Sequence, residues 1–185
     1  MSAAGSTRFP GGTRILGIDP GTLHLGYGVI DRLGSANLAY VECGVISAPA
    51  RQPRNQRLLT IGRGLREMLE ELAPDEVAME QAFYGKNVQA TLALGEARGV
   101  ALFVAADHGL SVVGYAPALV KKTIVGHGRA SKAQVGYLVR AVLGMHRPPG
   151  ADAADALAIA ICHARHGSAL AKLASAARTG VRCQP

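Results

Sequence analysis

The chain has 185 residues, and 49% of them are apolar, which suits one domain with its own core and argues against global disorder. No run approaches the roughly 20 apolar residues of a membrane span, and residues 1–12 lack the apolar stretch of a signal peptide. The cysteines Cys43, Cys162 and Cys183 show no CxxC spacing, which argues against a disulfide framework or a zinc site. We therefore expect a cytoplasmic protein.

The net charge of +7 is unevenly distributed along the chain. Residues 1–116 hold 10 Lys/Arg against 11 Asp/Glu, whereas residues 117–185 hold 10 Lys/Arg against two acids, Asp152 and Asp155. Such a basic segment favours a polyanion as partner, and a solubilising surface is the alternative.

The first two thirds of the chain alternate between strand and helix patterns. Short apolar runs separated by Pro, Gly and Asn predict three strands in an antiparallel meander, at 14–19, 25–31 and 38–47. Apolar residues at helical spacing predict a helix over 54–72, and a strand at 76–80 follows it. A strand reached through a helix implies a parallel crossover. A second helix and a fifth strand, at 87–108 and 111–116, repeat this arrangement.

The remainder of the chain has mainly helical patterns. We expect a short turn near 117–124, a glycine-bearing loop at 125–130, and helices at 131–143 and 150–166, with Ser131 as an N-cap. The predicted fold is a single α/β domain over 13–166: a mixed five-stranded sheet, three antiparallel strands and then parallel ones, with helices on both faces. Residues 1–12 are expected to be a disordered lead and 167–185 a disordered basic tail.

Four acidic residues occupy unusual positions. Asp19 and Glu80 each end an apolar strand, and the two strands are expected to be neighbours. Taken singly, a turn cap or an exposed strand end explains either acid better. Asp152 and Asp155 lie three residues apart, on one face of a helix near its start, where the helix dipole also favours acids.

Together the four carboxylates would form an all-oxygen set, which suits Mg²⁺ or Mn²⁺ and disfavours zinc. Two such ions, about 3.5–4 Å apart, activate a water and stabilise the departing oxygen of a phosphodiester. The set therefore predicts two-metal hydrolysis by in-line attack, leaving a 5′-phosphate and a 3′-hydroxyl.

Five ordered motifs within roughly residues 13–166 resemble the RuvC family of Holliday junction resolvases, which have an RNase H-like fold. They are ILGIDPGT (15–22), GYGV (26–29), MEQAF (79–83) with Lys86-Asn87, VKKTIVGHGRASK (120–132) and ADAADALAIAICH (151–163). The resemblance implies a metal-dependent endonuclease of DNA recombination and repair whose metal-binding and catalytic acids are Asp19, Glu80, Asp152 and Asp155. It also implies a homodimer that nicks two strands of like polarity in a four-way junction, and a RuvA/RuvB-type branch-migration complex as partner.

The resemblance places further residues on DNA. Lys121 and Lys132 match basic residues near the family's active site, where an ammonium can hold the scissile phosphate or stabilise its developing charge. Phe83 matches an aromatic that the family inserts near the junction centre, and core packing is an equal alternative. The wider candidates for phosphate contact are Lys86, Lys122, Arg129 and Arg140.

Some features leave alternatives open. The small residues of GEARG (95–99) permit either a dimer interface or tight internal packing, and the resemblance favours the dimer. The histidines receive no assigned role. A phosphate-binding protein of the actin and sugar-kinase type needs two lobes, and a non-catalytic junction-binding protein predicts a missing acid. Only the family motifs separate a resolvase from a related RNase H-like nuclease acting on RNA or another branched substrate.

Overall fold

The computed structural model describes the backbone of residues 8–34, 37–81 and 87–178, and the side chains of these residues as far as 167. Five strands form one sheet in the order β3-β2-β1-β4-β5. The strands are β1 (Thr13–Asp19), β2 (His24–Leu33), β3 (Asn37–Ser47), β4 (Glu76–Glu80) and β5 (Val112–Tyr115). The β3-β2-β1 pairs are antiparallel and the β1-β4-β5 pairs are parallel, which confirms the predicted mixed sheet.

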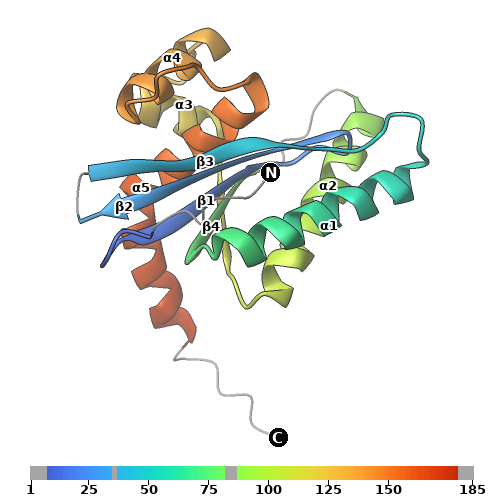
Figure 1. The fold of residues 1–185 in the computed structure, drawn as a ribbon, viewed down its shortest axis with the longest axis horizontal. Helices are drawn as coiled ribbons and strands as arrows, with labels where there is room; N and C mark the ends of the chain where they lie inside the picture. The colour runs from blue at the N-terminus through green and yellow to red at the C-terminus, as the bar shows by residue number, and fades with distance from the viewer. Residues whose placement is uncertain (1–7, 35–36, 82–86, 179–185) are drawn as a thin grey trace, which may run out of the picture.

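Helices cover both faces of this sheet (Figure 1). They are α1 (Arg54–Leu72), α2 (Val88–Asp107), α3 (Pro117–Val125), α4 (Lys132–Val142) and α5 (Ala151–Arg178). One core lies between the sheet and α1 with α2, and a second lies between the sheet and α3, α4 and α5. Because the central strands are buried on both faces, their sequences are almost continuously apolar rather than alternating.

Two helices differ from the sequence-based expectation. Residues expected as a short turn form α3, a helix of nine residues with Pro117 in its first turn, a position where proline's fixed φ suits a helix. Helix α5 continues beyond the end expected at 166 as far as Arg178, because alanine-rich sequence favours helix strongly enough to outweigh Gly167. The expected limits of the domain, at 13 and 166, stay predictions.

Helix α2 is unusually apolar on its exposed side. By length and composition it is the one helix among the described residues that could cross a membrane, which the sequence did not lead us to expect, and 22% of the relevant window is buried. Its exposed apolar side chains include Val88, Leu92 and Phe103, all at least 60% exposed. An added Cβ at Gly95 or Gly99 would meet nothing within 4 Å. Tight internal packing is therefore the wrong interpretation of these glycines, and they belong to an open helix face.

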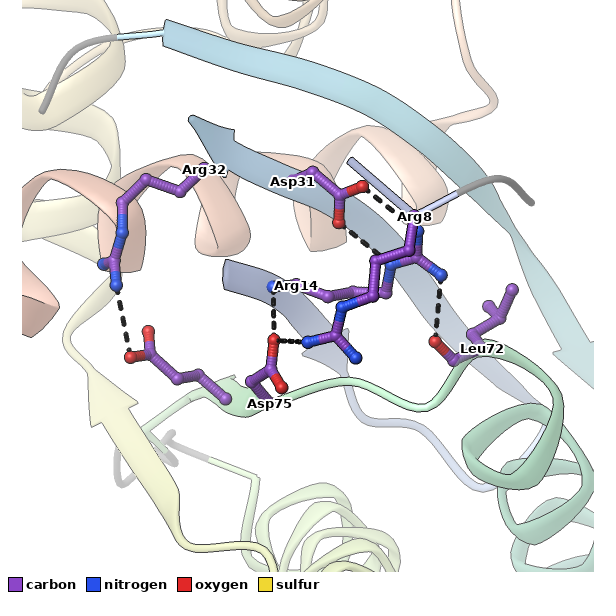
Figure 2. Close-up of polar contacts among 7 residues, drawn as sticks. Arg8, Arg14, Asp31, Arg32, Leu72 and Asp75 are labelled. Atoms are coloured by element: carbon purple, nitrogen blue, oxygen red, sulfur yellow. Dashed lines mark hydrogen bonds and ion pairs between the residues drawn. The ribbon is translucent and has the colours of Figure 1, made fainter. Parts of the chain in front are cut away.

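A buried polar network fixes the register of β1 against its neighbours (Figure 2). The Arg14 guanidinium donates to both carboxylate oxygens of Asp31, at 2.9 and 3.0 Å, and to the Leu72 carbonyl at 3.1 Å. Asp75, just before β4, accepts from the Arg14 backbone N–H at 2.8 Å and pairs with Arg8. Because removing one partner from a buried ion pair costs about 3–5 kcal/mol, the Arg14–Asp31 pair holds β1 against β2, and the bond from Arg14 N–H to Asp75 holds β1 against the start of β4.

Candidate active site

The alignment of β1 with β4 brings two acids to the same edge of the sheet. Ile18 lies opposite Met79 in the parallel register, so the next residues, Asp19 and Glu80, are neighbours at the strand ends. Side chains alternate between faces along a strand. Since Ile15 and Ala78 pack in the core beneath α5, the same alternation turns Asp19 and Glu80 toward α5.

Glycines in β1 and β2 let α5 lie directly on the sheet. A Cβ added to Gly17 would be 2.1 Å from the Ala156 carbonyl oxygen, and one added to Gly26 would be 2.3 Å from the Asp152 carbonyl oxygen. Gly26 is also the antiparallel partner of Asp19. The start of α5, with Asp152 in its first turn and Asp155 just after it, is therefore held beside Asp19. Glycine is unfavourable inside strands unless another backbone approaches closely, and this was the sequence signal for the contact.

Helices α3 and α4 close the site and supply two lysines. A cavity of about 240 Å³ is lined by Asp19, Glu80, Pro117, Val120, Lys121, Lys132, Val135, Asp155, Ala158 and Ile159. Ser131 caps α4 by accepting from the Gln134 backbone N–H while the Gln134 side chain accepts from the Ser131 N–H, which confirms the expected N-cap. This capping box fixes the start of α4 and places Lys132 at its first position.

Burial and mutual repulsion raise the pKa values of two of the acids. Burial, with Glu80, Asp155 and Asp152 nearby, raises the pKa of Asp19 from 3.8 to about 7, and Lys132 opposes this rise. Burial and Asp155 also raise the pKa of Glu80. Asp19, Glu80 and Asp155 line the same cavity. Asp152 is close enough to raise the pKa of Asp19 but does not line the cavity.

One of the acids is paired with a lysine ammonium. Lys132 Nζ donates to Asp155 Oδ2 at 2.7 Å, and this contact raises the pKa of Lys132. Among the described residues, no three His, Cys, Asp or Glu side chains are gathered tightly enough to hold an ion as they stand. The acids that line the cavity offer only carboxylate oxygens, which are the ligands that a hard divalent cation prefers. Their side chains would have to rotate to bring these oxygens around one ion.

The other residues predicted to contact DNA do not line this cavity or lie outside the described residues. Lys122 and Arg129 are exposed and do not line the cavity. Arg140 lies on α4 and lines an adjoining groove. Phe83 and Lys86 fall outside the described residues.

The histidines left without a role do not line the cavity. His163 is buried, with its ring nitrogens bonded to the Tyr115 hydroxyl at 2.9 Å and to Glu76 at 3.0 Å. His166 contacts the Thr123 hydroxyl at 3.0 Å. Both make structural contacts between α5 and its neighbours.

The raised pKa of Asp19 predicts a pH-dependent stability. Between pH 3.8, its ordinary value, and about 7, the folded chain binds more protons than the unfolded chain, so stability without metal falls as pH rises through this window. Adding Mg²⁺ should raise the melting temperature more at pH 8 than at pH 5, because metal ligation requires deprotonated carboxylates. Thermal unfolding at both pH values measures this. Asp19→Asn should reduce the loss of metal-free stability with rising pH, leaving only the contribution of Glu80. An unchanged loss of stability would show that Asp19 titrates normally.

A mixed five-stranded sheet, with acids at the ends of its two central strands and on the helix crossing them, defines the class of RNase H-like nucleases. Residues 15–163 match the family model described as crossover junction endodeoxyribonuclease RuvC. The chain therefore belongs to the RuvC family of endonucleases.

Individual relatives agree with this assignment. The crossover junction endodeoxyribonuclease RuvC of Rhodopseudomonas palustris strain BisA53 is 52% identical over 86% of this chain and 91% of the relative. The Thermus thermophilus RuvC structure is 33% identical, with a TM-score of 0.77 over 85% of this chain and 96% of its own. A structure of the T. thermophilus protein in complex with Holliday junction substrate is 34% identical, with a TM-score of 0.78 over 84% and 97%.

Proposed function

We propose that this chain resolves four-way DNA junctions by metal-dependent hydrolysis of two strands of like polarity, leaving 5′-phosphate and 3′-hydroxyl ends. The observation that carries this is the single cavity where acids from β1, β4 and α5 meet lysines from α3 and α4. The name and 52% identity of the R. palustris relative support four-way junctions as the substrate.

The four acids would hold the metal. Asp19 and Glu80 are carried by the sheet, and Asp152 and Asp155 by the N-terminal part of α5. Two Mg²⁺ ions, or Mn²⁺ in their place, would supply charge stabilisation and activation of the attacking water. The raised pKa values of Asp19 and Glu80 support the proposal, because a bound cation would relieve that repulsion.

The two lysines would act on the scissile phosphate. The Lys132 side chain is 73% exposed and is paired with Asp155. A cation that neutralised the Asp155 carboxylate would weaken this ion pair and free the lysine. Its ammonium, and that of Lys121, which also lines the cavity, can then donate to phosphate oxygens as charge develops on them. Lys122, Arg129 and Arg140 would bind the DNA backbone farther out, with a salt-dependent contribution to affinity. Phe83 and Lys86 are proposed as further DNA contacts from the family resemblance.

The open face of α2 supports a homodimer. Val88, Leu92, Gly95, Gly99 and Phe103 follow one another at intervals of three and four residues, which suits helix packing against a second copy. A two-fold dimer presents two identical sites, one for each strand to be cut. We also propose a branch-migration complex of the RuvA/RuvB type as partner, and action in the cytoplasm.

The test is incubation with a synthetic four-way junction labelled on each strand in turn, with Mg²⁺, with Mn²⁺ and with a chelator. We expect paired nicks at symmetric positions in two strands of like polarity. DNA ligase should seal these nicks, and the chelator should abolish them. A linear duplex and an RNA–DNA hybrid of the same sequence are the controls. Equal cutting of the hybrid would favour a nuclease of another substrate, and junction binding without cutting in any metal would favour a non-catalytic binding protein.

A further inference from the structure

A second groove adjoins the acid cavity. It has a volume of about 480 Å³ and is lined by Lys132, Ala133, Gly136, Tyr137, Arg140, Pro148, Pro149, Ala151, Ala154 and Asp155. Lys132 and Asp155 line both spaces, so the groove continues from the cavity along α4. A polymer bound at the acids can therefore pass into it without leaving the surface.

The groove combines a small apolar floor with a flat, exposed aromatic. The small alanine and glycine residues leave space within the groove, and the two prolines make part of its lining rigid. Tyr137 is 63% exposed, although a tyrosine is largely apolar. The Arg140 guanidinium carbon lies over one face of the Tyr137 ring, 5.7 Å from its centre, so a positive charge covers that face and a base would stack on the other.

We propose that this groove binds one nucleotide of the strand being cut, with its base stacked on Tyr137 and its phosphate held by Arg140. The proposal rests on the junction-cutting function proposed above. Five residues at about 1.5 Å rise place Tyr137 about 7.5 Å along α4 from Lys132, and each base step advances a strand by about 3.4 Å along the duplex axis. For a strand whose duplex axis follows α4, the nucleotide concerned therefore lies about two steps from the scissile phosphate.

Charge and shape both favour a nucleotide over a basic or purely apolar ligand. The single carboxylate of the lining, Asp155, is paired with Lys132, so the remaining charge of the groove is the Arg140 cation. Every base has a face that can stack on an aromatic ring, so such a contact tolerates different sequences. Arg140 thus acts within a defined subsite and not only as a dispersed phosphate contact.

The experiment compares Tyr137→Ala with Tyr137→Phe and with Tyr40→Ala, a control at an exposed tyrosine of β3. Single-turnover cutting and junction affinity are measured with intact junctions and with junctions carrying one abasic position within three nucleotides of the cut, on either side. We expect Tyr137→Ala to weaken junction binding about tenfold, a factor equal to about 1.4 kcal/mol and within the range of base–aromatic stacking. Tyr137→Phe and Tyr40→Ala should match the unaltered chain.

The abasic series separates stacking from a general structural effect. At one position, about two nucleotides from the cut, base removal should cost the unaltered chain about tenfold and cost Tyr137→Ala nothing further, since the contact is already lost. Additive losses at every position, or an unimpaired Tyr137→Ala, would overturn the subsite. If the unaltered chain cuts no junction in any metal, the proposed function fails instead, and the affinity series still decides whether the groove binds a base.

Discussion

Replacing Asp152 with asparagine is expected to slow junction cutting by at least about 10³-fold while binding of the junction persists. Asparagine keeps the shape of aspartate but loses the charge needed to hold a divalent cation. A metal contributes several kcal/mol of transition-state stabilisation, and each ~1.4 kcal/mol is a factor of ten in rate. Binding survives because removing a negative charge from a DNA-binding surface lowers repulsion. Single-turnover rates and gel-shift affinities measure the two effects.

The control for this prediction is Asp107→Asn. Asp107 is half exposed at the end of α2 and pairs with Arg66 at 2.9 Å, an exposed ion pair of small energetic value. That variant should cut at the normal rate. Full activity of Asp152→Asn would remove Asp152 from the metal site.

Gly26→Ala is expected to damage the site without altering any charged residue. The new Cβ would be 2.3 Å from the Asp152 carbonyl oxygen, a main-chain atom that moves only if α5 moves. Overpacking of this kind costs about 1–3 kcal/mol, or roughly 2–12 °C in melting temperature for a chain of this size. Displacement of the first turn of α5 would separate Asp152 from Asp19, so cutting should fall even far below the melting temperature.

Gly136→Ala is the matched control, because its Cβ would have the Ala154 Cβ as nearest neighbour, at 3.9 Å. In a helix, alanine is also favoured over glycine by about 1 kcal/mol. Gly136→Ala should therefore be at least as stable as the unaltered chain. Normal stability and normal cutting by Gly26→Ala would contradict the close contact between β2 and α5.

Much of the fold could be predicted because the strands are short, apolar and bounded by Pro and Gly, and because a helix between strands implies a parallel crossover. The failures have physical reasons. Residues 117–124 were expected to form only a short turn, whereas Pro117 is well suited to the first turn of the helix that they form. Residues 167–185 show no convincing helical periodicity, although their alanines favour helix and α5 continues to Arg178.

The candidate acids could be picked out from the sequence, but the pKa values of the acids and their pairing with lysine could not. A sequence gives the order of Asp19, Glu80, Asp152 and Asp155, and the family resemblance joins them. The pKa of about 7 for Asp19 depends on burial and on three acids that only the folded chain brings near. Pairing of Lys132 with Asp155 likewise needs the α4–α5 packing. Tyr137 gave no signal, because a tyrosine within a helix pattern is ordinarily part of the core.

The most direct measurement is the location of Mn²⁺ by anomalous diffraction in crystals of this chain. We predict a peak roughly 2.0–2.6 Å from carboxylate oxygens of Asp19 and at least one of the other three acids, with Lys132 Nζ moved away from its present 2.7 Å contact with Asp155. A peak elsewhere, or none in this cavity at Mn²⁺ concentrations that support junction cutting, would contradict the assignment of these acids to the metal.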